Sequence, residues 1–472
     1  MGNIDGGLLS RQEAFPDFDA LSVGVTDAGC ENDLGPFDPM EHAPIRIPYA
    51  NLPSYYAATA NPVCERQRLQ GDETCAIAIV GAGFTGMSAA VELVERGYSV
   101  IVVEGERVGW GASGRNGGQL VNGYSRKLAE VRKHYGAEAE RQFGEMAREG
   151  SDIIRQRVAK YGIECELRDG NAIVGMHEAH MRCLRGRVEE WHRHGFTDVE
   201  LLEGDAIRKI VNTDRYAGGY YDPRGGHMHP LNYVLGEAAA FEALGGRIFE
   251  QSRVTSIDRS AKPVVHTAQG RVLASKVLVC GNAYLGDAAP DLSARILPVS
   301  SQIVGTKILG KELLDDLFSA NSAVEDTRYI PDYYRRTADH RIIYGGGSVY
   351  GGTDPENIKD KIIPQLLLTF PQLRNVKIDF AWSGNFALTM TRYPQVGRVS
   401  DSVYYSQGDS GHGVTTTQML GRRLAEAIDG QLTKFDVFAN LPYISFIGGK
   451  VLRVPYCVIG SWYYGLRDKL GV

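Results

Sequence analysis

A glycine turn between two short apolar segments constrains this chain more than any other feature. Cys75–Val80 reads CAIAIV and Gly81–Gly86 reads GAGFTG; an amphipathic stretch covers Thr85–Arg96, and a second apolar run ends at Glu104. This order of strand, glycine turn, helix, strand and carboxylate is that of a dinucleotide-binding βαβ unit.

Each residue of this motif has a physical role. Gly81 allows the tight turn, Gly83 lets a pyrophosphate approach the backbone, and Gly86 lets the helix pack on the strand. The amides of the helix N-terminus favour phosphate charge. Glu104 can accept hydrogen bonds from ribose hydroxyls and would repel a 2′-phosphate. The motif therefore predicts FAD or NAD and disfavours NADP.

Glycine is also abundant over the whole chain, with 56 in 472 residues, and it gathers in clusters. Arg107–Gln119 is one such segment, which could follow an extended cofactor with Arg115 as a cation beside it, or could be an ordinary flexible loop. Gly408–Gly413 is expected to contact the cofactor too. Gly218–Gly226 and Gly345–Gly352 are expected on the substrate side.

Charge and cysteine content exclude several classes of protein. The formal net charge is -6 and no basic run occurs, so nucleic acid is not an expected partner. The most apolar stretch, Ala76–Val103, contains charged residues and is too polar to cross a membrane. The seven cysteines form no C-x-x-C motif. With no secretory signal at the N-terminus, these features predict a cytoplasmic protein.

The end of the chain repeats the architecture of its beginning. Val403–Gln407 is expected to form a strand, followed by the Gly408–Gly413 turn and a helix over Thr415–Ile428, and β-rich segments lie between the two units. The sequence therefore predicts an α/β fold in which a Rossmann-like cofactor domain is interleaved with a mixed β-sheet substrate domain. The expected segments are an acidic extension (1–52), cofactor-domain parts (53–165, 223–292 and 395–472) and substrate-domain parts (166–222 and 293–394).

Several motifs carry a family resemblance. GAGFTG with Glu104 and GASGRNGGQ resemble the flavin-dependent oxidases of the D-amino-acid-oxidase and sarcosine-oxidase superfamily. Within it, the chain resembles the gamma-glutamylputrescine oxidase family from about residue 53 to its end. The carriers of the narrower likeness are SYYAATAN (54–61), GRNGGQLVNGYSR (114–126), GGHMHPLN (225–232), GNAYLGD (281–287), DYYR (332–335), YGGGSVYG (344–351), GDSGHGVT (408–415) and FANLP (438–442).

The resemblance implies FAD as the cofactor. His412, between two glycines at the start of the last helix, would face the isoalloxazine and is the candidate catalytic residue. The implied cofactor-binding residues are Gly81, Gly83, Gly86, Glu104, Arg115, Asn116, Gly117, Val254, Gly281, Asn282, Gly411 and Gly413.

The chain departs from some sarcosine-oxidase relatives at two places. They carry a lysine soon after the glycine–histidine–glycine turn, whereas Val414–Thr417 is neutral here, so a cation for oxygen activation would have to be His412 or another residue. They also link the flavin to a cysteine, and Trp382–Leu388 contains none. Non-covalent FAD is therefore expected.

The resemblance implies oxidation of a primary amine by FAD and dioxygen, to an aldehyde, ammonia and hydrogen peroxide. Free or N-methyl amino acids, a dehydrogenase reaction and a flavin- or NAD-binding subunit without turnover remain alternatives. An alkylamine must lose a proton before oxidation, and His412, His227 and His229 are candidate acceptors. No histidine or cysteine cluster has a full metal-ligand set. Tyr334, Arg335 and His227 are the candidate substrate-binding residues, with Arg392 as a second candidate for a substrate carboxylate.

Overall fold

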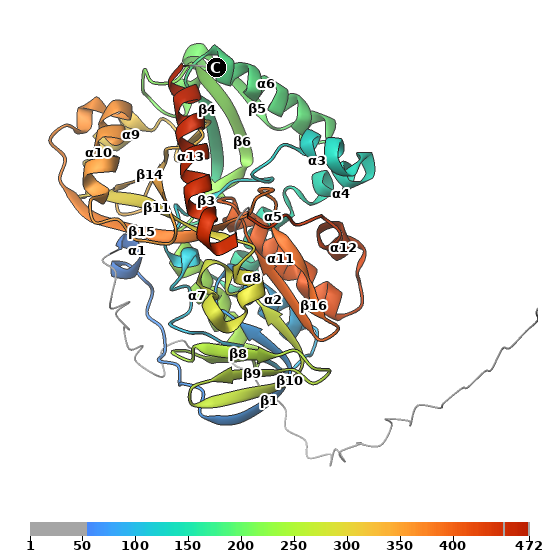
Figure 1. The fold of residues 1–472 in the computed structure, drawn as a ribbon. Coiled ribbons are helices and arrows are strands. Elements are labelled where there is room, and N and C mark those ends of the chain that lie inside the picture. Colours follow the sequence, from blue (N-terminus) through green and yellow to red (C-terminus); the bar gives the residue numbers. More distant parts are fainter. Residues whose placement is uncertain (1–53, 447–448, 471–472) are drawn as a thin grey trace, which may run out of the picture. The chain divides into compact units, whose positions relative to one another are not determined.

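The computed structural model describes residues 54–446 and 449–470 (Figure 1). The acidic extension predicted at 1–52 lies outside the described residues. None of the helices in the described ranges is both long and apolar enough to span a bilayer.

The first sheet has eight strands and contains the predicted βαβ unit (Figure 1). β1 is parallel to β2 and β10, β17 is parallel to β10, and β7 to β2. Helix α2 (Phe84–Glu95) connects β1 to β2, as the glycine turn predicts. The strands are β1 (Gly71–Val80), β2 (Val100–Val103), β7 (Arg247–Phe249), β8 (Val254–Asp258), β9 (Val264–Thr267), β10 (Gly270–Val279), β16 (Gln395–Ser400) and β17 (Val403–Gln407).

The second sheet has nine strands in the order β15-β11-β14-β13-β12-β4-β6-β3, with β5 paired to β6. It is mixed, because β4 and β12 are parallel while the other pairs are antiparallel. The strands are β3 (Gln119–Leu120), β4 (Arg168–Gly175), β5 (Glu200–Glu203), β6 (Gly218–His227), β11 (Leu297–Thr306), β12 (Ala323–Asp326), β13 (Tyr333–Arg336), β14 (Ile342–Tyr350) and β15 (Ile378–Leu388).

The chain alternates between the two sheets, which confirms the predicted interleaving. It forms β1 and β2 of the first sheet and then β3–β6 of the second. It returns to the first sheet for β7–β10, to the second for β11–β15, and to the first again for β16 and β17. The domain boundaries stay a prediction, but two segments differ from it. β6 continues past 222 to His227, and β3 pairs with β6 although it falls in a predicted cofactor segment.

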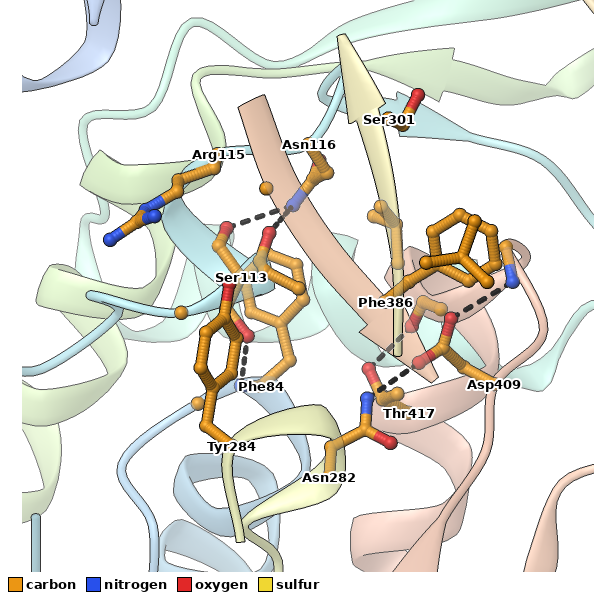
Figure 2. A pocket seen from close by; sticks show the side chains of 18 of the residues that line it. Phe84, Ser113, Arg115, Asn116, Asn282, Tyr284, Ser301, Phe386, Asp409 and Thr417 are labelled. Atoms are coloured by element: carbon orange, nitrogen blue, oxygen red, sulfur yellow. Dashed lines mark hydrogen bonds between the residues drawn. The ribbon is translucent and has the colours of Figure 1, made fainter. Parts of the chain in front are cut away.

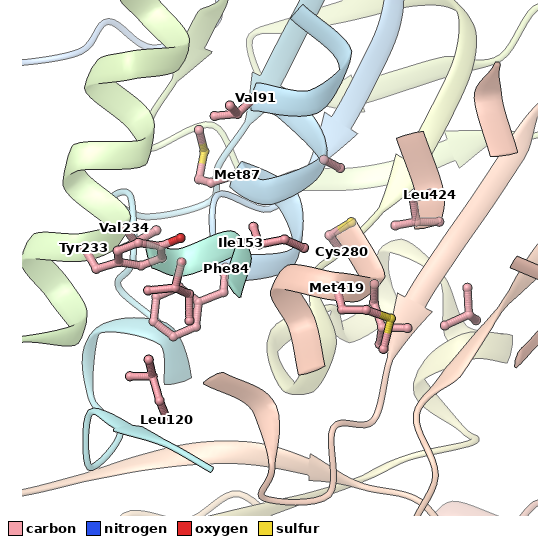
Figure 3. Packing of buried hydrophobic residues seen from close by; sticks show 14 of the residues in the cluster. Phe84, Met87, Val91, Leu120, Ile153, Tyr233, Val234, Cys280, Met419 and Leu424 are labelled. Carbon is pink, nitrogen blue, oxygen red and sulfur yellow. The ribbon is translucent and has the colours of Figure 1, made fainter. Parts of the chain in front are cut away.

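Helices pack closely beside the first sheet (Figure 3). Phe84 and Met87 of α2 belong to one buried cluster with Tyr233 of α7 (Pro230–Ala243) and Met419 of α11 (Gly413–Ile428). Gly421 explains the close approach of α11 to α2, because a Cβ there would lie 2.5 Å from the Ser88 Cβ. The remaining helices are α1 (Tyr55–Ala58), α3 (Leu128–Tyr135), α4 (Ala137–Met146), α5 (Glu149–Tyr161), α6 (Glu178–Arg193), α8 (Pro290–Ser293), α9 (Lys311–Leu317), α10 (Ile358–Thr369), α12 (Thr433–Ala439) and α13 (Gly449–Leu470).

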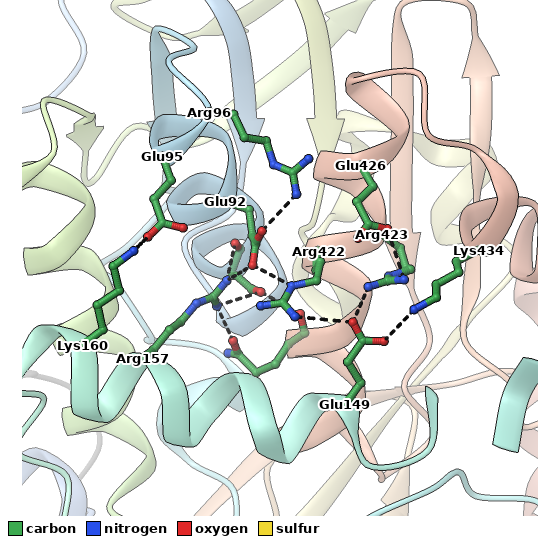
Figure 4. Close-up of polar contacts among 12 residues, drawn as sticks. Glu92, Glu95, Arg96, Glu149, Arg157, Lys160, Arg422, Arg423, Glu426 and Lys434 are labelled. Carbon is green, nitrogen blue, oxygen red and sulfur yellow. Dashed lines mark hydrogen bonds and ion pairs between the residues drawn. The ribbon is translucent and has the colours of Figure 1, made fainter. Parts of the chain in front are cut away.

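A buried ion-pair network joins α2, α5, α7 and α11 (Figure 4). Arg157 of α5 donates to Glu237 at 2.6 Å and to Glu92 at 3.1 Å. Glu92 also accepts from Arg422 at 2.8 Å and from Arg96 at 3.1 Å. Burial raises the pKa of Glu92, but the arginines outweigh it and hold that pKa below its usual value. Glu92 is therefore a carboxylate whose charge is fully matched inside the fold.

Candidate active site

A pocket of about 470 Å³ is lined by residues of both sheets and of the loops that follow their strands. This volume is in the range of cofactor and small-molecule sites. The predicted cofactor residues that line it are Gly81, Gly83, Glu104, Arg115, Asn116, Gly117, Val254, Gly281, Asn282, Gly411, His412 and Gly413.

The glycine turn after β1 has the geometry that its motif predicts. Gly81 has φ of +104°, where a side chain would be strained, and a Cβ there would lie 3.0 Å from the Cys280 carbonyl oxygen. A Cβ on Gly86 would lie 2.0 Å from the Gly81 carbonyl oxygen. Gly86 is outside the pocket lining, so its role is the packing of helix against strand.

Glu104 directly follows β2 and contacts that turn. Its carboxylate accepts from the Ala82 amide at 2.7 Å and from the Glu106 amide at 2.9 Å. Burial raises the pKa of Glu104, while these two hydrogen bonds oppose the shift. Val254 lines the same pocket.

Two further loops are tied together at the carboxyl ends of β10 and β17 (Figure 2). The Asn282 side-chain amide donates to Asp409 at 2.7 Å, and its oxygen accepts from the Gly408 amide at 2.9 Å. Asp409 also accepts from the Gly411 amide at 3.0 Å. Burial raises the pKa of Asp409 above its usual value, although its hydrogen bonds oppose this shift. The glycine turn before α11 is therefore fixed by side chains before any ligand binds.

The segment Arg107–Gln119 is an ordered turn rather than a flexible loop. The Asn116 side-chain amide donates to the Ala112 and Ser113 carbonyls at 3.0 and 2.8 Å, and its oxygen accepts from the Gly118 amide at 2.7 Å. The Arg115 guanidinium lies 4.1 Å from the Trp110 ring centre. Its buried Nη2 has no hydrogen-bond partner among the residues that the structure describes. An anionic or carbonyl group of a ligand would satisfy this nitrogen.

His412 precedes the first residue of α11 and lines the pocket. Burial, with the charge of Arg187, lowers its pKa to about 4, so the imidazole is neutral at pH 7. Its buried Nδ1 has no partner in the described part of the chain. His412 can donate or accept a hydrogen bond, but in this structure it is not the cation considered for oxygen activation.

On the second sheet, one face of adjacent strands closes the pocket. Ser301 of β11, Tyr333 of β13 and Glu325 of β12 all line it. The Ser301 and Tyr333 hydroxyls are 2.9 Å apart and hydrogen-bonded. Gly345 makes room for Tyr333, because a Cβ there would lie 2.2 Å from the ring. Ser301 and Glu325 are not predicted from the sequence, whereas Tyr333 belongs to the DYYR motif but is not among the predicted substrate-binding residues. Strand alternation with a buried Tyr334 points to Tyr333.

The three predicted substrate-binding residues do not line the pocket, which corrects that prediction. Tyr334 is fully buried on the opposite face of its strand and stacks on Tyr344, with ring centres 5.2 Å apart. Arg335 donates to the Gly117 carbonyl at 2.8 Å and to the Tyr56 hydroxyl at 3.1 Å. The His227 ring nitrogen Nε2 contacts the Asn321 carbonyl and side chain, each at 3.2 Å.

The candidate proton acceptors His227 and His229 are also corrected. Burial lowers the pKa of each to about 3. Neither lines the pocket, and His229 caps α7 by accepting from the Asn232 amide at 3.1 Å. Both are structural histidines.

The glycine cluster 218–226 does not reach the pocket either. It lies in β6, where a Cβ on Gly226 would come within 2.2 Å of the Arg168 carbonyl oxygen of β4. Close contact between strands, not a ligand, explains these glycines. Of the cluster 345–352, Gly347 does line the pocket.

Arg392 lines the pocket as a half-buried cation. Its Nη2 donates to the Tyr329 hydroxyl at 2.9 Å, and no ion pair to a carboxylate forms within the described ranges. The other arginine nearby, Arg328, is matched by Asp326 and Asp332. Besides Arg115, Arg392 is therefore a cation of this lining that is available to an anionic substrate group.

The donor set fits FAD. The pocket offers two glycine turns at strand ends, a carboxylate after β2 and the unpartnered Arg115 nitrogen. Cys280 lines it at the end of β10, and burial raises the pKa of that thiol to about 12, so it is protonated and unreactive. No cluster of metal-ligating side chains occurs among the described residues.

Known proteins resemble this chain over most of its length. Residues 76–427 match the family model described as DAO, FAD dependent oxidoreductase. "Gamma-glutamylputrescine oxidoreductase" of Escherichia coli (strain K12) is 49% identical over 89% of this chain and 99% of its own length. "Probable oxidoreductase OrdL" of Haemophilus influenzae is 37% identical over 88% of this chain and 97% of its own.

Solved structures show the same fold at low identity. Glycine oxidase from Geobacillus kaustophilus has a TM-score of 0.66 at 19% identity, covering 79% of this chain and 100% of its own. L-proline dehydrogenase from P. horikoshii has a TM-score of 0.63 at 20% identity, covering 85% and 99%. The family match, the relatives and the pocket agree: the chain belongs to the DAO family of FAD-dependent oxidoreductases.

Proposed function

We propose that this protein oxidises the terminal primary amine of gamma-glutamylputrescine. The observation that carries the proposal is the 49% identity to "Gamma-glutamylputrescine oxidoreductase" of Escherichia coli. The match covers 99% of the length of that relative. The charges in the pocket support it, because this substrate has an amine to be oxidised at one end and a carboxylate at the other.

The cofactor-side residues would hold FAD, which when bound supplies the hydride acceptor. Glu104 would accept from the ribose, and the amides after Gly81 and Gly83 would face the pyrophosphate. Gly411–Gly413, at the N-terminus of α11, would face the flavin ring and stabilise negative charge there. The site would be completed by the turn at Asn116 and Gly117 and by Val254, Gly281 and Asn282. The unpartnered Nη2 of Arg115 would donate a hydrogen bond to the cofactor.

Arg392 would bind the glutamyl carboxylate. A guanidinium matches a carboxylate in two parallel hydrogen bonds, and Tyr329 holds this one in place. Ser301, Tyr333 and Gly347 line the same pocket and form its wall on the second sheet. The aliphatic chain of the substrate would lie in this pocket, with its carboxylate at Arg392.

The proposed products are gamma-glutamyl-aminobutyraldehyde and ammonia, formed when water hydrolyses the imine left by oxidation. Dioxygen is the proposed second substrate and hydrogen peroxide the second product. The cytoplasm is the proposed compartment, and the described cysteines are free, as expected in a reducing environment. The alternative is oxidation of a free or N-methyl amino acid; glycine oxidase has this fold, but at 19% identity the likeness reaches no further than the fold.

A substrate panel tests the proposal. Purified protein in air is given gamma-glutamylputrescine, putrescine, spermidine, sarcosine and a set of amino acids, and peroxide, ammonia and aldehyde are measured. We expect the highest kcat/KM with gamma-glutamylputrescine, and a KM raised at least tenfold by Arg392→Ala. Activity confined to amino acids would overturn the substrate, and flavin reduction without peroxide would overturn the use of dioxygen.

A further inference from the structure

Glu325 lies on the pocket side of β12. Its neighbour Val324 belongs to the buried cluster that contains Tyr334 and Tyr344 on the opposite face of the sheet. Because side chains alternate along a strand, Glu325 points the other way, beside its cross-strand partner Tyr333. Glu325 is half-buried and lines the pocket, so its carboxylate is open to the cavity.

This carboxylate has no hydrogen bond or ion pair with any residue that the structure describes. The nearby cation Arg328 is taken by Asp326 and Asp332. Asp326 follows Glu325 on its own strand, Tyr333 faces it from β13, and on β6 the phenol of Tyr220 is within reach of its charge. All of these are neutral or negative. A buried carboxylate in such surroundings lacks the cation that would offset its desolvation.

The other acids of the pocket lining already have partners. Glu104 and Asp409 accept backbone hydrogen bonds, and Glu106 pairs with Arg253. His412, the remaining titratable base of the lining, is held neutral and weakly basic by burial. Glu325 is the acid of this lining that is free to meet a cationic ligand.

We propose that Glu325 binds the ammonium group of the amine that is oxidised and accepts its proton. In this step, the ammonium group of R–CH₂–NH₃⁺ transfers a proton to the Glu325 carboxylate. The products are R–CH₂–NH₂ and the neutral carboxylic acid of Glu325. One N–H bond breaks and one O–H bond forms, and no electrons leave the substrate. The amine keeps the lone pair that its oxidation requires.

The chemistry of both groups suits this exchange. Burial, with the charge of Asp326, raises the pKa of Glu325 to about 7, which makes it a much better proton acceptor than an ordinary carboxylate. Desolvation in the pocket would lower the pKa of an alkylammonium from its value of about 10.4 in water, and the charge of the Glu325 carboxylate would oppose part of that shift. The raised pKa of Glu325 and the desolvation of the amine both narrow the gap between the two pKa values, which favours proton transfer.

The proposal rests on the proposed amine oxidation, and a pair of ligands tests it. Gamma-glutamylputrescine reduces the flavin, and gamma-glutamyl-butylamide is the same molecule without the terminal amine. Anaerobic rapid mixing at pH 8 gives the apparent Kd and limiting rate for the amine, and perturbation of the flavin spectrum gives the Kd of the analogue. Both are measured in wild type, Glu325→Gln, Glu325→Asp and the exposed control Glu200→Gln on β5.

We expect Glu325→Gln to raise the apparent Kd of the amine at least tenfold and to lower its limiting rate about 100-fold. The Kd of the analogue should change less than twofold, Glu325→Asp should recover part of the loss, and Glu200→Gln should behave as wild type. In wild type the apparent Kd should rise about tenfold per pH unit below pH 7, and in Glu325→Gln this rise should be absent.

Unchanged amine binding and rate in Glu325→Gln would overturn the proposal. Equal weakening of both ligands would overturn it too, since Glu325 would then hold the glutamyl ammonium. If gamma-glutamylputrescine fails to reduce the flavin of the wild type, the substrate proposal is wrong independently of Glu325. The same variants are then measured with the amine of the panel that does reduce the flavin. Glu325→Gln should also raise the melting temperature by a few degrees at pH 8 and not at pH 4.5, a readout independent of turnover.

Discussion

Glu92 and Glu325 are both glutamates enclosed by the same protein, and they differ in their partners. Glu92 meets Arg157, Arg422 and Arg96 in the network between helices, and its pKa is held below the ordinary value. Glu325 meets no cation, and burial raises its pKa to about 7. The first glutamate stabilises the fold, whereas the second costs stability at neutral pH. A carboxylate kept at such a cost beside a cofactor pocket indicates a ligand that offsets it.

The largest expected effect comes from removing the partner that Glu92 shares with Glu237. Arg157→Ala leaves two buried carboxylates without their common cation, and we expect a loss of about 3–5 kcal/mol in the free energy of unfolding. Urea unfolding measures it. The control is Arg141→Ala, whose partners Glu138 and Glu145 lie on the exposed surface, and no measurable change is expected. A small loss in Arg157→Ala would mean that the network is dispensable.

The next effect comes from the wall beside Glu325. Gly345→Ala places a Cβ 2.2 Å from the Tyr333 ring, so the ring must move. We expect a loss of about 1–3 kcal/mol in unfolding free energy and weaker binding of the amine. Gly186→Ala on α6 is the matched control, since nothing lies within 4 Å of its added Cβ, and it should gain about 0.5–1 kcal/mol. Wild-type substrate binding in Gly345→Ala would show that Tyr333 does not shape the pocket.

The smallest effect concerns one hydrogen bond of that wall. Ser301→Ala removes the partner of the Tyr333 hydroxyl, and we expect a loss of about 0.5–1.5 kcal/mol in stability. A double-mutant cycle with Tyr333→Phe isolates the bond, because the double variant should lose little more than either single one. Fully additive losses would show that the two hydroxyls do not interact.

The sequence predicts the cofactor half of this site well and the substrate half poorly. The cofactor half is made of short motifs in which glycines and a carboxylate act through the backbone at fixed spacing, so Gly81, Gly83 and Glu104 are readable from the chain alone. The βαβ unit and the interleaving of two sheets follow from the same motifs.

The substrate half depends on which face of a strand points inward. Tyr334 belongs to a motif whose pocket residue is Tyr333, one position earlier, and a shift of one residue reverses the face. Arg335 is two positions after Tyr333 and shares its face, but its guanidinium is bound to the Gly117 carbonyl and the Tyr56 hydroxyl, outside the pocket lining. Glu325 lies in a short strand with no motif of its own, and only its place between β13 and β4 brings it to the pocket. Long-range pairing of this kind leaves no local pattern in the sequence.

The most direct test is the free energy of unfolding of Glu92→Gln and Glu325→Gln as a function of pH. Glu92 has a folded pKa below the unfolded value of 4.5, so its stabilisation is present above pH 4.5 and is lost as the pH falls through the folded pKa. Glu325 has a folded pKa of about 7, so its cost is absent below pH 4.5 and complete above pH 7.

At pH 8 we therefore predict opposite signs. Glu92→Gln should lose about 1.5–3 kcal/mol, the contribution of hydrogen bonds to a charged group. Glu325→Gln should gain stability, on the order of 3 kcal/mol at most, and the gain should vanish at pH 4.5. A loss of stability in Glu325→Gln at pH 8 would contradict the account, because it would make Glu325 a second structural carboxylate.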